Sequence, residues 1–188
     1  LKARQEKSDN PEILPKVTKE DIPKSREYAK SQSFEDDNKN FYYKVGTNGI
    51  TYHSIILPCD PLTQDEFKIA SLFTNTLTDV GIGDKSYEDI QKIQSAVTGG
   101  ISASFTLIPN ENQSAHSLGL KITSKSLEEN ENKMQDLMID TAKNSNFSDK
   151  NRIKDMLNFI SSDNEKSLIQ NGHVLSMSNA AAQINNIS

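Results

Sequence analysis

The side chains best suited to bind a metal ion or to attack a substrate are three histidines and one cysteine: His53, His116, His173 and Cys59. Two side chains of one helix meet on the same ion when they stand one helical turn apart. No histidine of this chain has an acidic residue, a cysteine or another histidine three or four positions away. The spacing therefore excludes a metal site on a single helix, although ligands distant in the sequence could still converge.

Cys59 stands between Pro58 and Asp60, with no histidine beside it to draw off the thiol proton. A thiol without such a partner behaves as a small apolar side chain. We therefore expect Cys59 to be half-buried and inert. Because the chain has one cysteine, an intramolecular disulfide is excluded, and a reducing compartment fits this composition.

Two further motifs resemble binding sites but are better explained by local structure. Thr98-Gly99-Gly100 lacks the lysine and the following Ser or Thr of a phosphate-binding loop, and it follows a predicted helix, whose carboxyl end repels anions. We expect a helix end with close backbone packing there. The acidic run Glu128-Glu129-Asn130-Glu131 stands where a helix begins, a position that favours negative charge.

Composition restricts the classes of partner. The 188 residues predict one domain, with an appendage at most, and 21 basic against 26 acidic residues give a net charge of −5. Basic residues are scattered among acids, which argues against a nucleic-acid partner. Apolar runs such as Ser54-Ile55-Ile56-Leu57 are far too short to span a membrane. Since the chain begins at Leu1 rather than at a methionine, we expect a processed or excised fragment of a longer protein.

The first part of the chain predicts a linker and then a hairpin. Residues 1–38 are polar and interrupted by Pro11, Pro15 and Pro23, which break regular elements. Residues 41–45 and 50–57 are strand-like, and Asn48-Gly49 between them favours a tight turn. We expect these two strands to pair with each other.

The middle of the chain predicts two capped helices and a second pair of strands. Thr63 and Glu66 form a capping box for a helix over residues 64–80, and Gly81 and Gly83 end it. Ser86 caps a helix over residues 87–97. The apolar stripe of the first helix contains Phe67, Ile69, Ala70, Leu72, Phe73, Leu77 and Val80. That of the second contains Tyr87, Ile90, Ile93, Ala96 and Val97. Residues 101–108 and 114–123 alternate as strands.

Three helices complete the chain. One spans residues 127–144 and is expected to bury Met134, Leu137, Met138 and Thr141; a second is capped by Ser148; a third spans residues 168–184. The order β-β-α-α-β-β-α-α-α predicts an α+β fold in which helices cover one face of a mainly antiparallel sheet.

Two blocks of this sequence carry a family resemblance. The first block contains Leu1-Lys2-Ala3-Arg4-Gln5, Ile13-Leu14-Pro15-Lys16-Val17 and Asp21-Ile22-Pro23. The second runs from Tyr42 to about Lys143 and contains Asn48-Gly49-Ile50, residues 72–81, Tyr87 and residues 98–104. These blocks resemble the end of the helical-hairpin linker and the third domain of presequence-protease-like peptidases, a branch of the pitrilysin group of inverted zinc metallopeptidases.

The resemblance implies a domain without the family's catalytic groups. In such peptidases the zinc, two histidines and a glutamate base lie on a helix of the first domain, and the third domain is a degenerate copy of it. The equivalent helix here is residues 64–80, where Ser71 and Asn75 take the place of the histidines and Thr74 that of the glutamate. We therefore expect no catalytic, cofactor-binding or metal-binding residue in this chain and a zinc ion elsewhere in the parent enzyme.

The resemblance also implies the boundaries and partners. Residues 1–38 would be the linker and residues 39–188 the non-catalytic domain, truncated at its carboxyl end. The domain would wall a chamber that degrades short unfolded peptides of the targeting-peptide type, against the catalytic N-terminal half and the last domain of the same chain. The expected location is intracellular, in a bacterial cytoplasm or an organelle matrix. The alternatives are an inactive structural or assembly subunit of the same fold and an unrelated α+β binding domain.

Overall fold

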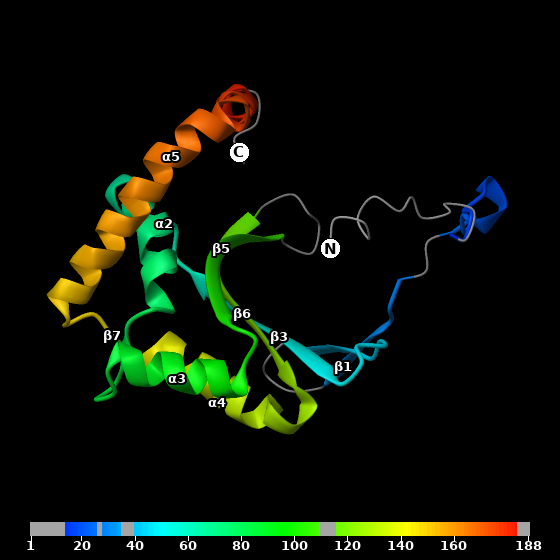
Figure 1. The fold of residues 1–188 in the computed structure, drawn as a ribbon, viewed down its shortest axis with the longest axis horizontal. Coiled ribbons are helices and arrows are strands. Elements are labelled where there is room, and N and C mark those ends of the chain that lie inside the picture. The colour runs from blue at the N-terminus through cyan, green and yellow to red at the C-terminus, as the bar shows by residue number, and fades with distance from the viewer. Residues whose placement is uncertain (1–13, 26–27, 35–39, 110–115, 184–188) are drawn as a thin grey trace, which may run out of the picture. The chain divides into compact units, whose positions relative to one another are not determined.

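The computed structural model describes residues 14–25, 28–34, 40–109 and 116–183, which fall into two compact units, Leu1–Gly46 and Thr47–Ser188. Figure 1 shows the elements of each unit. Unit 1 contains the short 3-10 helix η2 (Lys19–Asp21) and an antiparallel pair of strands, β1 (Ser31–Phe34) and β2 (Asn40–Tyr43). The hydroxyl-bearing Thr18 and the carboxylate of Asp21 form a capping box at η2.

Unit 2 is built on a three-stranded antiparallel sheet. Its strands are β3 (Ile50–Cys59), β5 (Ile101–Pro109) and β6 (His116–Leu127), in the spatial order β3-β6-β5. The helices are α2 (Gln64–Leu77), α3 (Tyr87–Val97), α4 (Glu131–Asn144) and α5 (Lys150–Ala182), with a 3-10 turn η3 (Glu128–Asn130) before α4. Two short strands, β4 (Gly81–Ile82) and β7 (Ser145–Asn146), pair beside the helices. The predicted α+β class with antiparallel strands is confirmed.

Strand alternation gives the sheet two unlike faces, because successive side chains point to opposite sides. The inner face meets the helices and carries Ile55, Ile101, Ala103, Leu120 and Ile122, which pack into one core with Leu77, Ile90, Met134, Leu137 and Met138. Ile122, Met134 and Met138 have no exposed surface. The residues that alternate with these form the open face: Tyr52, Ser54, Ile56, Ser102, Ser104, Thr106, Ile108, Gly119, Lys121, Thr123 and Lys125. No helix among the described residues of unit 2 packs against the open face.

The predicted hairpin between residues 41–45 and 50–57 is wrong. Asn48 and Gly49 do adopt positive φ angles of 52° and 77°, and the amide of Ile50 donates to the carbonyl of Thr47 at 3.2 Å, so the turn forms as expected. However, β2 pairs with β1, and β3 pairs along its full length with β6. The reason is that β3 and β6 place apolar residues on the same face, with Ile55 opposite Ile122, and both pack into the core.

Several predicted helix boundaries also differ. Helix α2 ends at Leu77, before either glycine, and its expected stripe is only partly buried: Phe67 remains 74% exposed, whereas Thr74 and Thr76 are buried. The segment 127–144 begins its helix at Glu131, because β6 continues to Leu127. The buried set expected for this helix, Met134, Leu137, Met138 and Thr141, is confirmed.

The last two predicted helices form one element. Helix α5 runs from Lys150 to Ala182, with a non-helical residue at Asn171 (φ −112°, ψ 17°) that kinks it close to the predicted break. Its cap is Asp149, whose carboxylate accepts from the amide of Arg152 at 3.0 Å, and the expected cap at Ser148 is wrong. The amide of Ser148 instead donates to the side chain of Asn146. The predicted end of the last helix, residue 184, lies outside the residues that the structure describes.

Candidate functional site

Helix α2 has the local sequence that a well-defined first turn requires. The hydroxyl of Thr63 accepts from the amide of Glu66 at 3.3 Å, and the Glu66 carboxylate accepts from the amide of Thr63 at 2.8 Å. This reciprocal pair satisfies donors that the first turn would otherwise leave without partners. The backbone and side-chain hydrogen bonds from Thr63 lower the pKa of Glu66 below its ordinary value of 4.5. The capping box predicted from the sequence is confirmed.

The family resemblance places the zinc motif of a hydrolytic relative at three positions of α2, which carry Ser71, Thr74 and Asn75. Ser71 and Asn75 are exposed, and Thr74 is buried with its hydroxyl donating to the carbonyl of Ser71 at 3.1 Å. Hydroxyls and amides are not the imidazole, thiolate or carboxylate ligands that zinc takes from proteins. The hydroxyl of Thr74 is moreover engaged within the helix. These residues do not fit a zinc ion.

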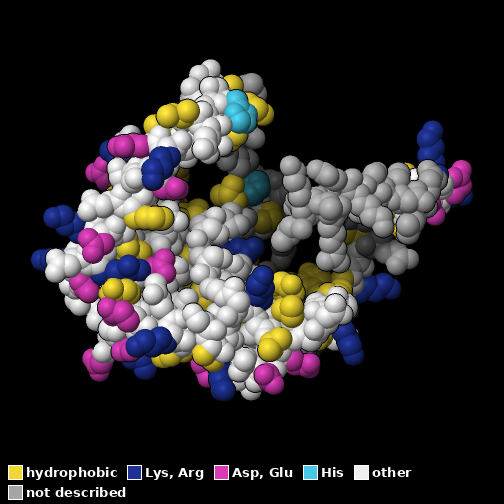
Figure 2. Space-filling view, in the orientation of Figure 1, with side chains coloured by type: hydrophobic (Ala, Val, Ile, Leu, Met, Phe, Trp, Pro, Cys, Tyr) yellow, Lys and Arg dark blue, Asp and Glu magenta, His cyan; other side chains and the backbone are white. Residues whose placement is uncertain are grey.

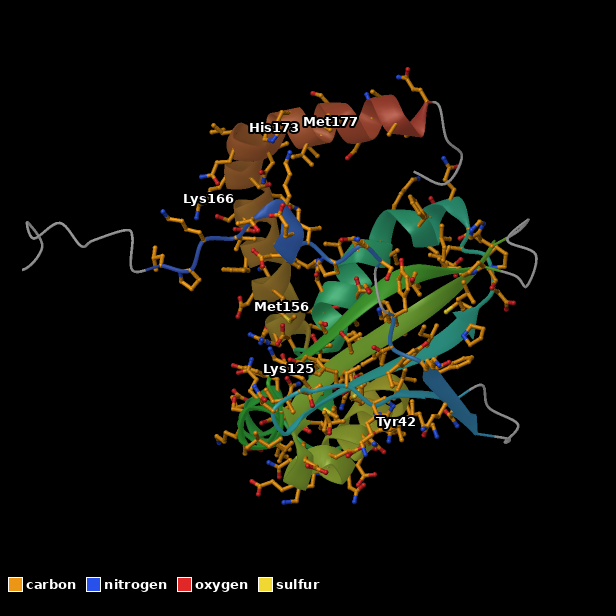
Figure 3. The ribbon with its side chains drawn as sticks, turned by 90° about the vertical axis from the view of Figure 1, so that its right-hand side faces the viewer. Tyr42, Lys125, Met156, Lys166, His173 and Met177 are labelled. Atoms are coloured by element: carbon orange, nitrogen blue, oxygen red, sulfur yellow. The ribbon has the colours of Figure 1, made fainter. Side chains whose placement is uncertain are left out.

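A groove lies beside α2, between it, α3 and α5, with a cavity volume of about 560 Å³. Asn75 and Asp79 of α2, Gln91 of α3 and Arg152, Asp155 and Met156 of α5 are among its lining residues. Figure 3 labels Met156 on α5. The lining mixes polar and apolar side chains, and it holds no histidine, cysteine or serine.

Arg152 joins three helices at the end of this groove. Its Nε donates to the carbonyl of Asp79, just past α2, at 3.1 Å, and its guanidinium lies 4.1 Å from the centre of the Tyr87 ring at the start of α3. A guanidinium over an aromatic face is attracted by the negative charge of that face. Because Arg152 itself belongs to the first turn of α5, this contact fixes the start of α5 on the other two helices. The role is structural.

The four residues first considered for chemistry lie on three elements, β3, β6 and α5. His53 is on the inner face of β3, His116 is the exposed first residue of β6, and His173 is exposed on α5. Cys59 is partly buried at the end of β3, and its thiol lies 3.3 Å from the carbonyl of Leu57, which confirms the expected half-buried position. Over the described ranges, no three His, Cys, Asp or Glu side chains gather in a group that could hold a metal ion.

Thr98-Gly99-Gly100 ends α3 and packs against the sheet, as predicted. The amide of Thr98 donates to the carbonyl of Gln94 at 2.8 Å, and the amide of Gly99 donates to the carbonyl of Lys125 at 2.7 Å. Gly100 has a φ of 101°, which favours glycine. A Cβ atom on Gly99 would lie 2.9 Å from Cε of Lys125, so glycine at this position leaves room for the lysine side chain.

The comparisons with known proteins agree with these observations. A family model described as associated with peptidases of metallopeptidase family 16, subfamily C, matches residues 1–188. The chain belongs to this peptidase-associated family. It is similar to "Presequence protease, mitochondrial" of Yarrowia lipolytica, 26% identical over 186 residues that make up 98% of this chain and 19% of the relative. It is also similar to the proteins of the same name from Drosophila melanogaster (26%; 98% of this chain and 18% of the relative) and Danio rerio (27%; 76% and 14%).

This peptidase-associated chain therefore spans about a fifth of the length of the curated relatives that it matches. The resemblance read from the two sequence blocks is confirmed, since the family model covers the whole chain. Among the helices that the structure describes, none combines the length and apolar character needed to cross a membrane.

The family resemblance rests in part on residues 72–81 and 98–104, whereas no role was predicted for the open face of the sheet. The signal was present in Lys121-Ile122-Thr123-Ser124-Lys125, where lysines and a threonine alternate with buried residues. This alternation predicts a strand and places the two lysines on the same side of it.

Proposed function

We propose that this chain is a non-catalytic part of a zinc-dependent peptidase of the presequence-protease type, in which it forms one wall of a chamber that degrades short unfolded peptides. The observation that carries the proposal is the set of side chains on α2. In a chain of this peptidase-associated family, Ser71, Thr74 and Asn75 stand where a hydrolytic domain would need two imidazoles and a carboxylate.

Exposed apolar side chains on α5 support a place within a larger protein. Phe159 is 74% exposed and Ile169 is 90% exposed, and Leu168, Val174, Leu175 and Met177 are also exposed. Apolar surface of this kind is commonly covered by a neighbouring domain. The proposed neighbours are the catalytic N-terminal half and the last domain of the same parent chain. The names of the relatives support an organelle matrix as the location.

The proposal is tested by comparing residues 1–188 with the full-length protein that contains them. Zinc content is measured by mass spectrometry, and hydrolysis is followed with an unstructured fluorogenic peptide. The full-length protein is expected to contain zinc and to cleave the peptide, whereas residues 1–188 alone are expected to do neither. Stoichiometric zinc or turnover in residues 1–188 would contradict the non-catalytic role. A full-length protein that is folded but cleaves no peptide would favour the inactive assembly subunit.

A variant of the full-length protein tests the role of α2 directly. Because Asn75 is exposed and is not proposed to act on substrate, Asn75→Ala should leave kcat/KM within about twofold of the starting protein. A matched control is Gln91→Ala on α3, another exposed residue of the groove. A large selective loss of kcat in Asn75→Ala, with unchanged thermal stability, would place a catalytic residue on α2 and overturn the proposal.

A further inference from the structure

The sequence contains two asparagine-glycine pairs, Asn48-Gly49 and Asn171-Gly172. An asparagine side chain is open to attack by the backbone amide nitrogen of the next residue, and glycine allows this attack most readily because it has no side chain to shield the nitrogen or restrict its backbone. All four residues are exposed. The two pairs therefore share the same local chemistry, and a difference in their reactivity has to come from the surrounding fold.

The turn at Asn48-Gly49 is held in one conformation. Its two residues have φ angles of 52° and 77°, and the amide of Ile50 closes the turn by donating to the carbonyl of Thr47 at 3.2 Å. The carbonyl of Gly49 also accepts from the amide of Glu128 at 3.0 Å, which ties the turn to the start of η3. These hydrogen bonds have to break before the backbone can rearrange for attack, so the fold protects Asn48.

Asn171-Gly172 lies at the kink of α5. Asn171 has a φ of −112° and a ψ of 17°, whereas a regular helix has values of about −63° and −42°. Figure 3 shows α5 changing direction between Lys166 and His173. A Cβ atom built on Gly172 would meet no described atom within 4 Å. The peptide bond between Asn171 and Gly172 is thus already outside regular helical geometry and has open space around it.

The part of α5 beyond the kink is exposed to solvent. Every residue from Asn171 to Gln183 is exposed, and Figure 2 shows apolar side chains at the surface of this end of α5. Val174, Leu175 and Met177 are among them. Segments with few buried contacts open locally at a small cost in free energy. The kink therefore reaches the conformations required for attack more readily than the turn at Asn48 does.

We propose that the kink makes Asn171, rather than Asn48, the site of spontaneous deamidation in this chain. The amide nitrogen of Gly172 gives up its proton to solvent and forms a bond to Cγ of Asn171. The bond from Cγ to the side-chain nitrogen breaks, and that nitrogen takes up protons from solvent and leaves as ammonia. Water then opens the cyclic imide at one of its two carbonyl groups. The product is aspartate or isoaspartate, and water is the only co-reactant.

Both products change the chemistry of the kink. Each places a new carboxylate there, and isoaspartate also adds one carbon atom to the main chain. The reaction therefore alters the backbone at the residue where α5 departs from helical angles. This inference does not depend on the proposed function, since it involves neither a substrate nor a metal ion.

Peptide mapping by mass spectrometry tests the inference in the full-length protein that contains residues 1–188. The protein is incubated at mildly alkaline pH, well below its Tm, and sampled over time. Deamidation raises the mass of a peptide by about 1 Da, because an NH group is replaced by oxygen. Asn171 should react at least about fivefold faster than Asn48, the factor that corresponds to one hydrogen bond of the turn. Asn158, which precedes Phe159 in the regular part of α5, serves as an internal control and should stay unmodified.

Unfolding and one substitution provide the controls. In urea the two asparagine-glycine pairs should react at similar rates, because the fold no longer distinguishes them. Gly172→Ala should slow the reaction at Asn171, since a methyl group shields the attacking nitrogen, and should leave the rate at Asn48 unchanged. Equal rates at the two pairs in the folded protein, a faster reaction at Asn48, or no reaction at Asn171 would overturn the inference. A preference for Asn171 that persists in urea would also overturn it, because the preference would then come from the neighbouring sequence and not from the kink.

Discussion

The two faces of the β3-β6-β5 sheet share the same strands but differ in their side chains and in what packs against them. On the inner face, Ile55, Ile122 and Ala103 stand in one row across the three strands and pack under the helices. On the open face, the next row is Ser54, Thr123 and Ser102, and two of its hydroxyls bond to each other. The comparison teaches that adjacent residues of one strand can lie in the core and at the surface, so one face can be altered without disturbing the packing of the other.

The largest expected effect comes from the inner face. Because Ile122 has no exposed surface, Ile122→Ala should lower the free energy of unfolding by about 2–5 kcal/mol, through lost burial and the cavity left behind. Urea unfolding followed by circular dichroism measures this loss. The matched control is Thr123→Ala, one residue away on the open face, which should cost less than about 1 kcal/mol. Similar losses in both variants would show that the two faces are not distinct in stability.

A smaller effect is expected at the cap that starts α2, one of the helices that cover the inner face. Thr63→Ala removes the hydroxyl that accepts from the amide of Glu66 and should cost about 1 kcal/mol of unfolding free energy. Thermal unfolding of this variant should be compared with Thr63→Ser, which retains a capping hydroxyl and should stay close to the starting protein. No difference between the alanine and serine variants would mean that the cap does not stabilise α2.

The same cap predicts a pH dependence. The hydrogen bonds from Thr63 lower the pKa of Glu66 in the folded state, so the ionised carboxylate stabilises the fold above its ordinary pKa of 4.5. That contribution is lost as the pH falls below 4.5, through the lowered pKa of the folded protein. The difference in Tm between the protein and Glu66→Gln should therefore be present at neutral pH and shrink on acidification. A difference that grows towards acid pH would have the wrong sign.

The smallest effect on stability is expected where the open face meets the end of α3. In Gly99→Ala the new methyl group would press on Cε and Cγ of Lys125, at 2.9 and 3.0 Å, and the flexible side chain can move away. We expect a change of less than about 0.5 kcal/mol in unfolding free energy, which urea unfolding measures. A loss of more than about 1 kcal/mol would show that the Lys125 side chain cannot move away from the new methyl group.

Local signals in the sequence were sufficient for many elements. The caps at Thr63 and Ser86 depend on residues three positions away, and both form as predicted. The buried stripe of α4 repeats at helical spacing and was predicted correctly, since Met134, Leu137, Met138 and Thr141 are all buried. In these cases the information lies within a few residues, and the fold need not be known.

The errors arose where contacts between residues distant in the sequence determine strand pairing or burial. Strand β3 is adjacent in sequence to β2 but pairs with β6, about seventy residues later, and a suitable turn at Asn48-Gly49 does not determine the partner. Phe67 belongs to the apolar stripe of α2 by its spacing, yet it remains exposed because none of the described helices or strands of unit 2 covers it. The substitutions on α2 were interpretable only through the family resemblance, since Ser71, Thr74 and Asn75 carry no signal by themselves.

The kink in α5 has a mechanical consequence. The first part of this helix is fastened through Arg152, and the part after Asn171 extends for eleven residues, Gly172 to Ala182, or about 16 Å. A change of about 10° in direction at Asn171 would carry the tip through about 3 Å, which is close to the width of a side-chain contact. The backbone angles of Asn171 thus determine the position of the exposed apolar residues at the end of α5, Val174, Leu175 and Met177.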